Sequence, residues 1–202
     1  MATQITGATR HPTADALLDA TQRLLIDVGV GGLSTRRIAD EAGQTHGSIR
    51  YHFGTLEALV VAVVDRTTDT ITARQRAMYE SDRPFREKWR QAMDWFEQDL
   101  EGGYPKLFAE LSAAAWNMPA CRPGLLRTTQ AWSDLLSDAV SAAAEEYGLE
   151  LDDPIIRGVA GIVRSSQAGM LFDRLAGIDV DHDHILAAVD ELIGVLERGA
   201  QR

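Results

Sequence analysis

The run from Gln44 to Leu56 combines basic side chains with hydrogen-bonding groups and contains no acid. Arg50, His46 and His52 supply positive charge or ring nitrogens, and the serine, threonine and tyrosine of the run supply hydroxyls. Groups of these kinds bond to the phosphates of duplex DNA and to base edges in its major groove. The chemistry that this run favours is therefore recognition of a DNA duplex.

The segment around this run has the spacing of a helix-turn-helix. Ser34 is placed to cap a short helix that buries Ile38, Gly43 is placed to end it, and Thr45 is placed to cap the next helix. Two short helices joined by a glycine-containing turn form the arrangement whose second helix enters the major groove. Gly47 would keep the front of that second helix thin, so that its main chain can approach the bases.

Arg36 is the strongest candidate for reading a base. Its guanidinium can bond two acceptors on one guanine, which discriminates against other bases by about 1–3 kcal/mol. The polar neighbours would bond to phosphates and set the position of the protein without reading sequence. The predicted DNA-binding residues are Ser34, Thr35, Arg36, Thr45, His46, Gly47, Ser48, Arg50, Tyr51, His52 and Thr55.

The formal net charge of −10 opposes nucleic-acid binding when it is taken as a sum. Its distribution along the chain is uneven. Residues 1–66 hold six basic and seven acidic side chains, a net of −1, so −9 of the −10 lies downstream. The acidity thus belongs to a second region with another task.

The run from Gly32 to Leu59 closely resembles the signature of the TetR (tetracycline-repressor) family. It shows a capping Ser/Thr, a basic residue, Ile-Ala, an Ala-Gly turn, a Gly-Ser step, an aromatic cluster ending in Phe, and Glu-Ala-Leu opening the next helix. The resemblance covers roughly residues 16–64 and implies a one-component bacterial regulator that binds operator DNA as a dimer. Two positions depart from the pattern: Leu56 replaces a usual phosphate-binding lysine, and Arg50 stands where tyrosine is more common.

Apolar residues recur at helical spacing along the chain, and strand-like alternation is absent, which predicts an all-α fold. With the resemblance, we expect about nine helices: an N-terminal three-helix helix-turn-helix domain and a larger C-terminal helical domain for ligand binding and dimerisation. The expected division is a flexible arm over 1–10, DNA binding over 11–55, and ligand binding and dimerisation over 56–202. Four helices precede residue 80, and later ones are expected near 85–101, 106–117, 122–147, 154–176 and 182–199.

Two of the later helices carry patterns suited to a dimer, as the resemblance implies. The helix from Pro154 has small residues at three- or four-residue spacing, and the last helix has an apolar stripe, so together they could form a four-helix bundle across a two-fold axis. The alternative is that both stripes pack within one subunit. The predicted interface residues are Ile155, Gly158, Val159, Ile162, Ser166, Gly169, Val189, Ile193 and Leu196.

All four tryptophans fall between Trp89 and Trp132, a concentration that could line an apolar cavity, although most such residues are core. The resemblance implies that a ligand there favours a pose of the fourth helix that misplaces the recognition helices and weakens DNA binding. The predicted ligand-binding residues are Trp89, Met93, Phe96, Phe108, Trp116, Met118, Trp132, Gln167 and Met170.

An enzyme is not expected. The single cysteine, Cys121, has no histidine near it in sequence, and no glycine-rich phosphate loop is visible. The one metal-like cluster, 181–184, sits where a helix begins, and acids suit the positive end of a helix dipole. No catalytic residue, metal or cofactor is therefore predicted.

The expected partners are double-stranded operator DNA, a second copy of the chain and a small-molecule effector of unknown identity. The chain has no stretch of about 18 apolar residues and no apolar signal core, so no membrane association and a cytoplasmic, nucleoid-associated location are expected. A dimer on an operator blocks polymerase without a further contact surface, which favours a repressor. The alternatives are an architectural or cell-division DNA-binding protein of the same fold, and a peptide-binding helical module, which would leave the acid-free run unexplained.

Overall fold

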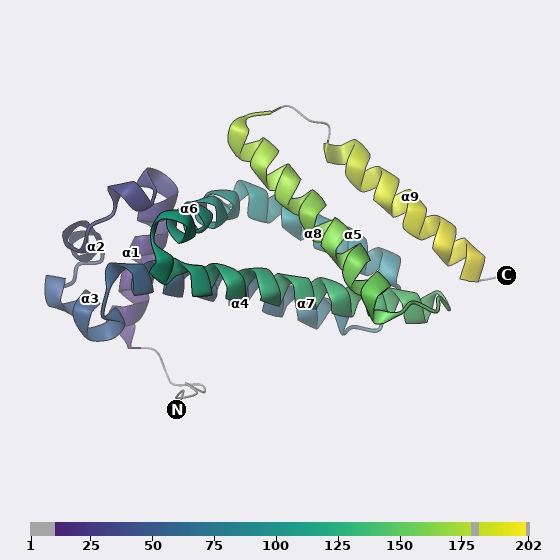
Figure 1. Ribbon diagram of the computed structural model, residues 1–202, viewed down its shortest axis with the longest axis horizontal. Helices are drawn as coiled ribbons and strands as arrows, with labels where there is room; N and C mark the ends of the chain where they lie inside the picture. The colour runs from purple at the N-terminus through teal and green to yellow at the C-terminus, as the bar shows by residue number, and fades with distance from the viewer. Residues whose placement is uncertain (1–10, 179–181, 201–202) are drawn as a thin grey trace. The chain divides into compact units, whose positions relative to one another are not determined.

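The computed structural model describes residues 11–178 and 182–200, and every regular element within them is a helix (Figure 1). This confirms the predicted all-α fold with about nine helices. The predicted flexible arm, 1–10, lies outside the described residues. No helix within 11–178 or 182–200 is long and apolar enough to cross a membrane. The α-helices and two 3-10 turns are α1 (Pro12–Val28), η1 (Val30–Gly32), α2 (Thr35–Glu41), α3 (His46–Phe53), α4 (Leu56–Tyr79), α5 (Phe85–Glu101), α6 (Tyr104–Asn117), η2 (Pro119–Cys121), α7 (Arg122–Glu146), α8 (Asp153–Ala176) and α9 (His182–Ala200).

The chain forms two compact units. Unit 1 contains the described residues up to Asp65 together with Lys106–Leu125, and unit 2 contains Arg66–Pro105 together with the described residues from Leu126 onward. The long helix α4 therefore supplies residues to both units, and so does α6. The functional division that we drew from the sequence, with DNA binding in 11–55, stays a prediction.

Unit 1 is built on the apolar face of α1, which packs against both α2 and α3. Leu17 and Leu25 of α1, Ile38 of α2 and Ile49 of α3 are at most 1% exposed and lie in one cluster, which Val63 of α4 joins. Burying each such side chain stabilises the fold by about 1.5–3 kcal/mol. The sequence pattern thus fixes which face of α2 and α3 is turned inward.

The end of α1 is held by a contact with α6 inside unit 1. Gly29 has φ 70° and ψ 176°, a conformation that is almost restricted to glycine. The next backbone N–H, that of Val30, donates a 2.7 Å hydrogen bond to the Glu110 carboxylate. A Cβ at Gly29 would lie only 2.7 Å from the same carboxylate. Glycine is therefore required here for both conformation and space.

Unit 2 has its own core, to which α4, α5, α7 and α9 contribute. Phe85 and Trp89 of α5, Ala139 of α7 and Ile193 of α9 are all at least 92% buried in one cluster. Pro84 precedes α5 and offers no side-chain acceptor, so the first N–H of the helix, on Phe85, needs another partner. The Glu146 carboxylate supplies it, with oxygens at 2.9 and 3.0 Å.

An ion cluster joins α5 to α9. Asp190 of α9 accepts hydrogen bonds from Arg86 Nη2 at 2.7 Å and from Arg90 Nε at 2.8 Å. Gly194 makes room for the first guanidinium, because a Cβ there would lie 2.6 Å from Arg86 Nη1. The hydrogen bonds from Arg90 and Arg86 hold the pKa of Asp190 well below its ordinary value.

This lowered pKa predicts an acid-sensitive contribution to stability from Asp190. A carboxyl with a depressed folded pKa contributes fully above its unfolded pKa of about 3.9, and the contribution is lost as the pH falls through the folded pKa. We expect Asp190→Asn to lower the melting temperature at pH 7. The difference in melting temperature between parent and variant should become smaller below about pH 4. Glu191→Gln is the control, since Glu191 is 71% exposed and 3.4 Å from Arg86. A difference in melting temperature that does not change with pH would contradict the lowered pKa of Asp190.

Candidate nucleic-acid interface

The turn between α2 and α3 sets the direction of the second helix. Gly43 has φ 62°, which a side chain would disfavour, and the N–H of Gln44 donates to the Ala39 carbonyl at 2.8 Å. Ile38 and Ile49 point into the core of unit 1 from the two helices. The opposite edge of α3 is consequently left on the surface.

The predicted DNA-binding residues lie on that surface, and none of them is buried. Tyr51 is 84% exposed, although it is a large aromatic residue. Ser48 and His52 are half-buried. The exposed members are Ser34, Thr35, Arg36, Thr45, His46, Gly47, Arg50, Tyr51 and Thr55.

The three predicted capping residues of this region each precede their helix, and two of them cap it with a side-chain hydrogen bond. Ser34 Oγ accepts from the N–H of Arg37 at 3.1 Å, and Thr55 Oγ1 accepts from the N–H of Ala58 at 3.1 Å. Thr45 does precede α3, but its hydroxyl makes no capping hydrogen bond. Instead it lies 2.9 Å from Ser48 Oγ. Thr45 is therefore the N-cap residue of α3, as predicted, but it does not cap the helix with its side chain.

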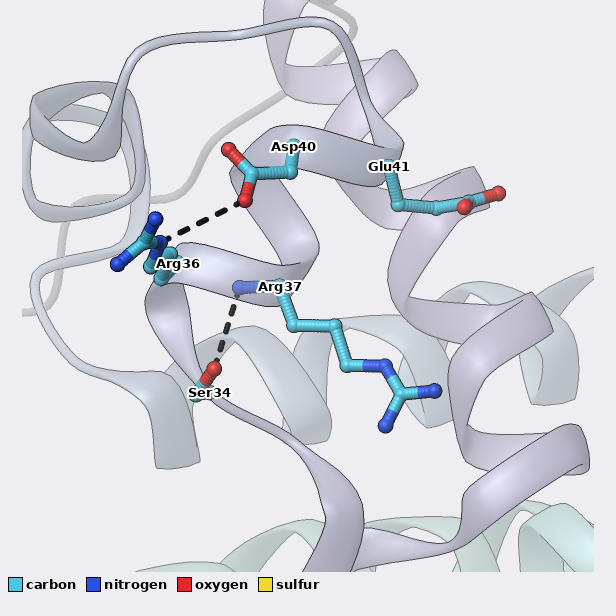
Figure 2. A pocket seen from close by; sticks show the side chains of 5 residues that line it. All are labelled: Ser34, Arg36, Arg37, Asp40 and Glu41. Atoms are coloured by element: carbon cyan, nitrogen blue, oxygen red, sulfur yellow. Dashed lines mark hydrogen bonds and ion pairs between the residues drawn. The ribbon is translucent and has the colours of Figure 1, made fainter.

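Arg36 and Arg37 leave α2 in different directions, as Figure 2 shows. Arg36 Nε lies 3.8 Å from Asp40 Oδ2, and the arginine side chain is 80% exposed. An exposed pair of this length contributes little, so the guanidinium can turn to another acceptor at small cost. Arg37 extends along the other side, with Nη1 3.5 Å from the Gly32 carbonyl.

Asp40 places an acid beside the acid-free run. Its Oδ1 lies 3.9 Å from His46 Nε2 at the start of α3. The next acid, Glu41, is engaged by Arg23 of α1 at 3.1 Å. The surface of α2 therefore carries both acidic and basic side chains, whereas α3 carries no acid.

His52 lies within a short row of rings. Its ring centroid lies 4.8 Å from that of Tyr51, edge to face, and 5.2 Å from that of His11. Sequence reasoning missed His11, which precedes α1 and caps it by accepting from the N–H of Thr13 at 3.3 Å. Pro12 at the helix start was the signal for the cap, but no local pattern links His11 to α3.

Leu56 opens α4 and packs, partly buried, against the core of unit 1. No cation is available at this position. Arg50, exposed on α3, is the nearest arginine or lysine in sequence.

The predicted dimer residues divide by exposure. Ile162 is 71% exposed, and Ile155, Gly158, Val159, Ser166, Gly169 and Leu196 are exposed as well. Val189 and Ile193 instead pack in the core of unit 2, with Ile193 only 8% exposed. Further large apolar side chains stand free on the same two helices, namely Phe172, Leu192 and Val195.

The predicted ligand-binding residues are shared between the two units. In unit 2, Trp89, Met93, Phe96 and Met170 are buried, and Trp132 Nε1 donates to the Oε1 of the buried Gln167 at 2.9 Å. Phe108, Trp116 and Met118 belong to unit 1. Trp116 is 83% exposed, and Met118 packs against a small cluster that contains Cys121.

Unit 2 contains an apolar cavity of about 180 Å³ among α4, α5, α7, α8 and α9. Trp89 from the predicted ligand set lines it. So do Val159, Val189, Ile193 and Leu196, which we predicted as dimer contacts. A stripe of apolar residues on a helix does not by itself distinguish a dimer interface from the lining of a cavity.

The metal-like cluster at 181–184 falls partly outside the described residues, because Asp181 is not one of them. His182 Nε2 lies 3.5 Å from Asp173 Oδ2. Within 11–178 and 182–200, no three histidine, cysteine or acidic side chains are grouped as metal ligands.

Comparison with known proteins relates both the sequence and the fold to regulators. Residues 17–63 match the family model for bacterial regulatory proteins of the tetR family. A putative TetR-family transcriptional regulator from Rhodococcus sp. is 26% identical, with a TM-score of 0.71 over 90% of this chain and 98% of that one. No curated protein sequence matches the chain.

Two further solved structures share the fold. Reduced NemR from E. coli is 19% identical, with a TM-score of 0.72 over 90% of this chain and 97% of that one. FadR from Bacillus subtilis, solved with stearoyl-CoA, is 14% identical, with a TM-score of 0.72 over 89% of this chain and 96% of that one. The likeness therefore extends well beyond residues 17–63.

Proposed function

Because residues 17–63 match the family model for bacterial regulatory proteins of the tetR family, we propose that this chain represses transcription by binding a specific operator. The observation that supports this most directly is the orientation of α3. Ile49 is 1% exposed, whereas Arg50 and Tyr51 stand free on the surface. A helix fixed from behind and polar in front is the geometry that major-groove recognition requires.

The proposed active species is a homodimer. A two-fold pair of recognition helices reads a palindrome whose half-sites lie about one helical turn apart or somewhat more. The exposed apolar side chains of α8 and α9, Ile162 and Leu192 among them, support dimerisation through these helices. Large exposed apolar patches are rare on monomers and mark association sites.

We further propose that a small apolar or amphipathic ligand releases the repressor from DNA. The apolar cavity in unit 2 supports this part, and the structural relative solved with stearoyl-CoA binds an amphipathic molecule. Helix α4 runs from Leu56 to Tyr79 and so belongs to both units. A ligand that favours one pose of α4 would change the placement of the helix-turn-helix and lower its affinity for the operator.

Selection of random duplexes by the purified chain tests this function. We expect an enriched palindrome, and binding that weakens steeply as salt rises, because phosphate contacts release counterions. An architectural protein would bind DNA but enrich no palindrome. Failure to bind any duplex at low ionic strength would contradict the proposal.

His52→Ala should weaken binding to all duplexes by a similar factor, since we assign its ring to a phosphate contact and not to base reading. We expect a few-fold loss on operator and on unrelated DNA alike. Fluorescence anisotropy at three salt concentrations measures both. His184→Ala is a matched control, because His184 is exposed on α9, far along the chain from the helix-turn-helix. A loss confined to the operator would show that His52 reads sequence.

A further inference from the structure

The cavity in unit 2 has a lining that defines the chemistry of its occupant. Its walls are aliphatic and aromatic side chains from five helices and from the segment between α7 and α8. None of the sixteen lining residues is charged. A carboxylate, phosphate or ammonium group placed inside would lose its hydration, and no lining side chain would neutralise its charge, which is unfavourable. The lining therefore favours a neutral occupant.

One polar group in this lining has no partner. Tyr147 is 6% exposed, and its hydroxyl is buried without a hydrogen bond. The Arg86 backbone lies nearby, but not in hydrogen-bonding geometry. Desolvation by burial raises the pKa of Tyr147 to about 12, so the group keeps its proton near neutral pH. A buried donor without an acceptor is uncommon in native proteins and calls for explanation.

The size of the cavity limits the occupant further. An apolar cavity of about 150 Å³ stays dry and accommodates benzene. The volume here is about 180 Å³, which is room for a single ring with a short substituent. A long acyl chain would not be enclosed by it.

We propose that this cavity binds a neutral, single-ring molecule with one hydrogen-bond acceptor, and that the Tyr147 hydroxyl donates to that acceptor. The inference rests on the proposed function in one respect only, that the occupant is the effector that releases the operator. The ring packs against Phe85, Trp89 and Val163, and the acceptor satisfies the buried hydroxyl. The cavity thus discriminates by shape and by one directional bond.

Calorimetric titration of the full chain with three probes tests the proposal without DNA. Acetophenone supplies a ring and an acceptor, α-methylstyrene has nearly the same shape with a methylene in place of the oxygen, and benzoate adds a charge. We expect acetophenone to bind about three- to tenfold more tightly than α-methylstyrene, the range for one net hydrogen bond, and benzoate not to bind. Equal affinity for the first two, or no binding of either, would overturn the inference.

Two variants locate the binding. Tyr147→Phe should remove the preference for acetophenone and leave the affinity for α-methylstyrene unchanged. This variant should fold at least as well as the parent, since it deletes a buried group that has no partner. Ala143→Leu should fill the cavity and abolish binding of both probes, while leucine keeps the helix propensity of α7. Persistence of the acetophenone preference in Tyr147→Phe, or of binding in Ala143→Leu, would place the probes elsewhere and overturn the assignment.

Operator binding by the same variants separates the two proposals. If acetophenone binds as expected but no duplex is recognised, the cavity assignment stands and the regulatory function fails. If the operator is bound but the probes are not, the function stands and the cavity assignment fails. If both bind and acetophenone does not release the operator, the occupant is not the effector.

Discussion

Gly29→Ala is expected to lower the free energy of unfolding of unit 1 by about 3 kcal/mol or more. At φ 70° and ψ 176° an alanine suffers a backbone strain of about 1–3 kcal/mol. The new Cβ would also displace the Glu110 carboxylate, which lies 2.7 Å from it and bonds to the N–H of Val30. Losing a hydrogen bond to a charged group costs about 1.5–3 kcal/mol more. Chemical unfolding followed by circular dichroism measures the change.

Gly31→Ala is the matched control for this prediction. It lies two residues away, has no positive φ, and a Cβ there would meet no atom within 4 Å. We expect a change of less than about 1 kcal/mol for it. Combining Gly29→Ala with Glu110→Ala separates the causes, because the clash disappears in the double variant and the backbone strain does not. Equal destabilisation by Gly29→Ala and Gly31→Ala would show that neither cause operates.

The helices were predictable because their starts and ends are encoded locally. Pro84 before α5 and the glycine at 102 after it fix a helix at Phe85–Glu101, as the sequence indicated. Helix α6 begins at Tyr104, two residues earlier than expected, because Pro105 is tolerated in the first turn of a helix. Local signals of this kind need no knowledge of the rest of the fold.

No local sequence signal predicted the contacts that hold the helices together. Glu110 and Val30 are 80 residues apart, and Arg86 and Asp190 are 104 apart. When its own segment is considered alone, each of these charged side chains looks like an ordinary charged residue on the surface. Gly194, which admits the Arg86 guanidinium, looks in sequence like a weak point in a helix. A single sequence does not record which distant side chain meets which.

The two predicted sites also differ in whether their residues come from one segment or from distant segments of the chain. The predicted DNA-binding residues come from one continuous segment, Ser34 to Thr55, so they could be proposed together, and none of them is buried in the structure. The cavity draws on five helices, and its unpartnered group, Tyr147, lies at the end of α7 outside the predicted set. Trp116, chosen for its type, is 83% exposed. Residue type alone does not identify a cavity lined by distant segments.

Arg36→Ala is expected to remove base discrimination at one position in each half-site. The guanidinium is 80% exposed and held only by a 3.8 Å contact with Asp40, so it can present both of its donor edges to a guanine. The loss per half-site is about 1–3 kcal/mol, and a palindrome bound by a dimer contains two half-sites. The difference in affinity between the operator and a duplex altered at that base pair should therefore vanish in the variant. Competition anisotropy with the two duplexes measures it.

Arg37→Ala and Arg36→Lys complete the test. Arg37→Ala removes the same charge from the neighbouring position of α2, and we expect it to weaken both duplexes equally through the lost attraction to phosphates. Arg36→Lys keeps the charge but not the two-pronged donor, so it should lose most of the discrimination while retaining general affinity. If Arg36→Ala instead weakened both duplexes by the same factor, Arg36 would be a phosphate contact, and base reading would have to come from the exposed edge of α3.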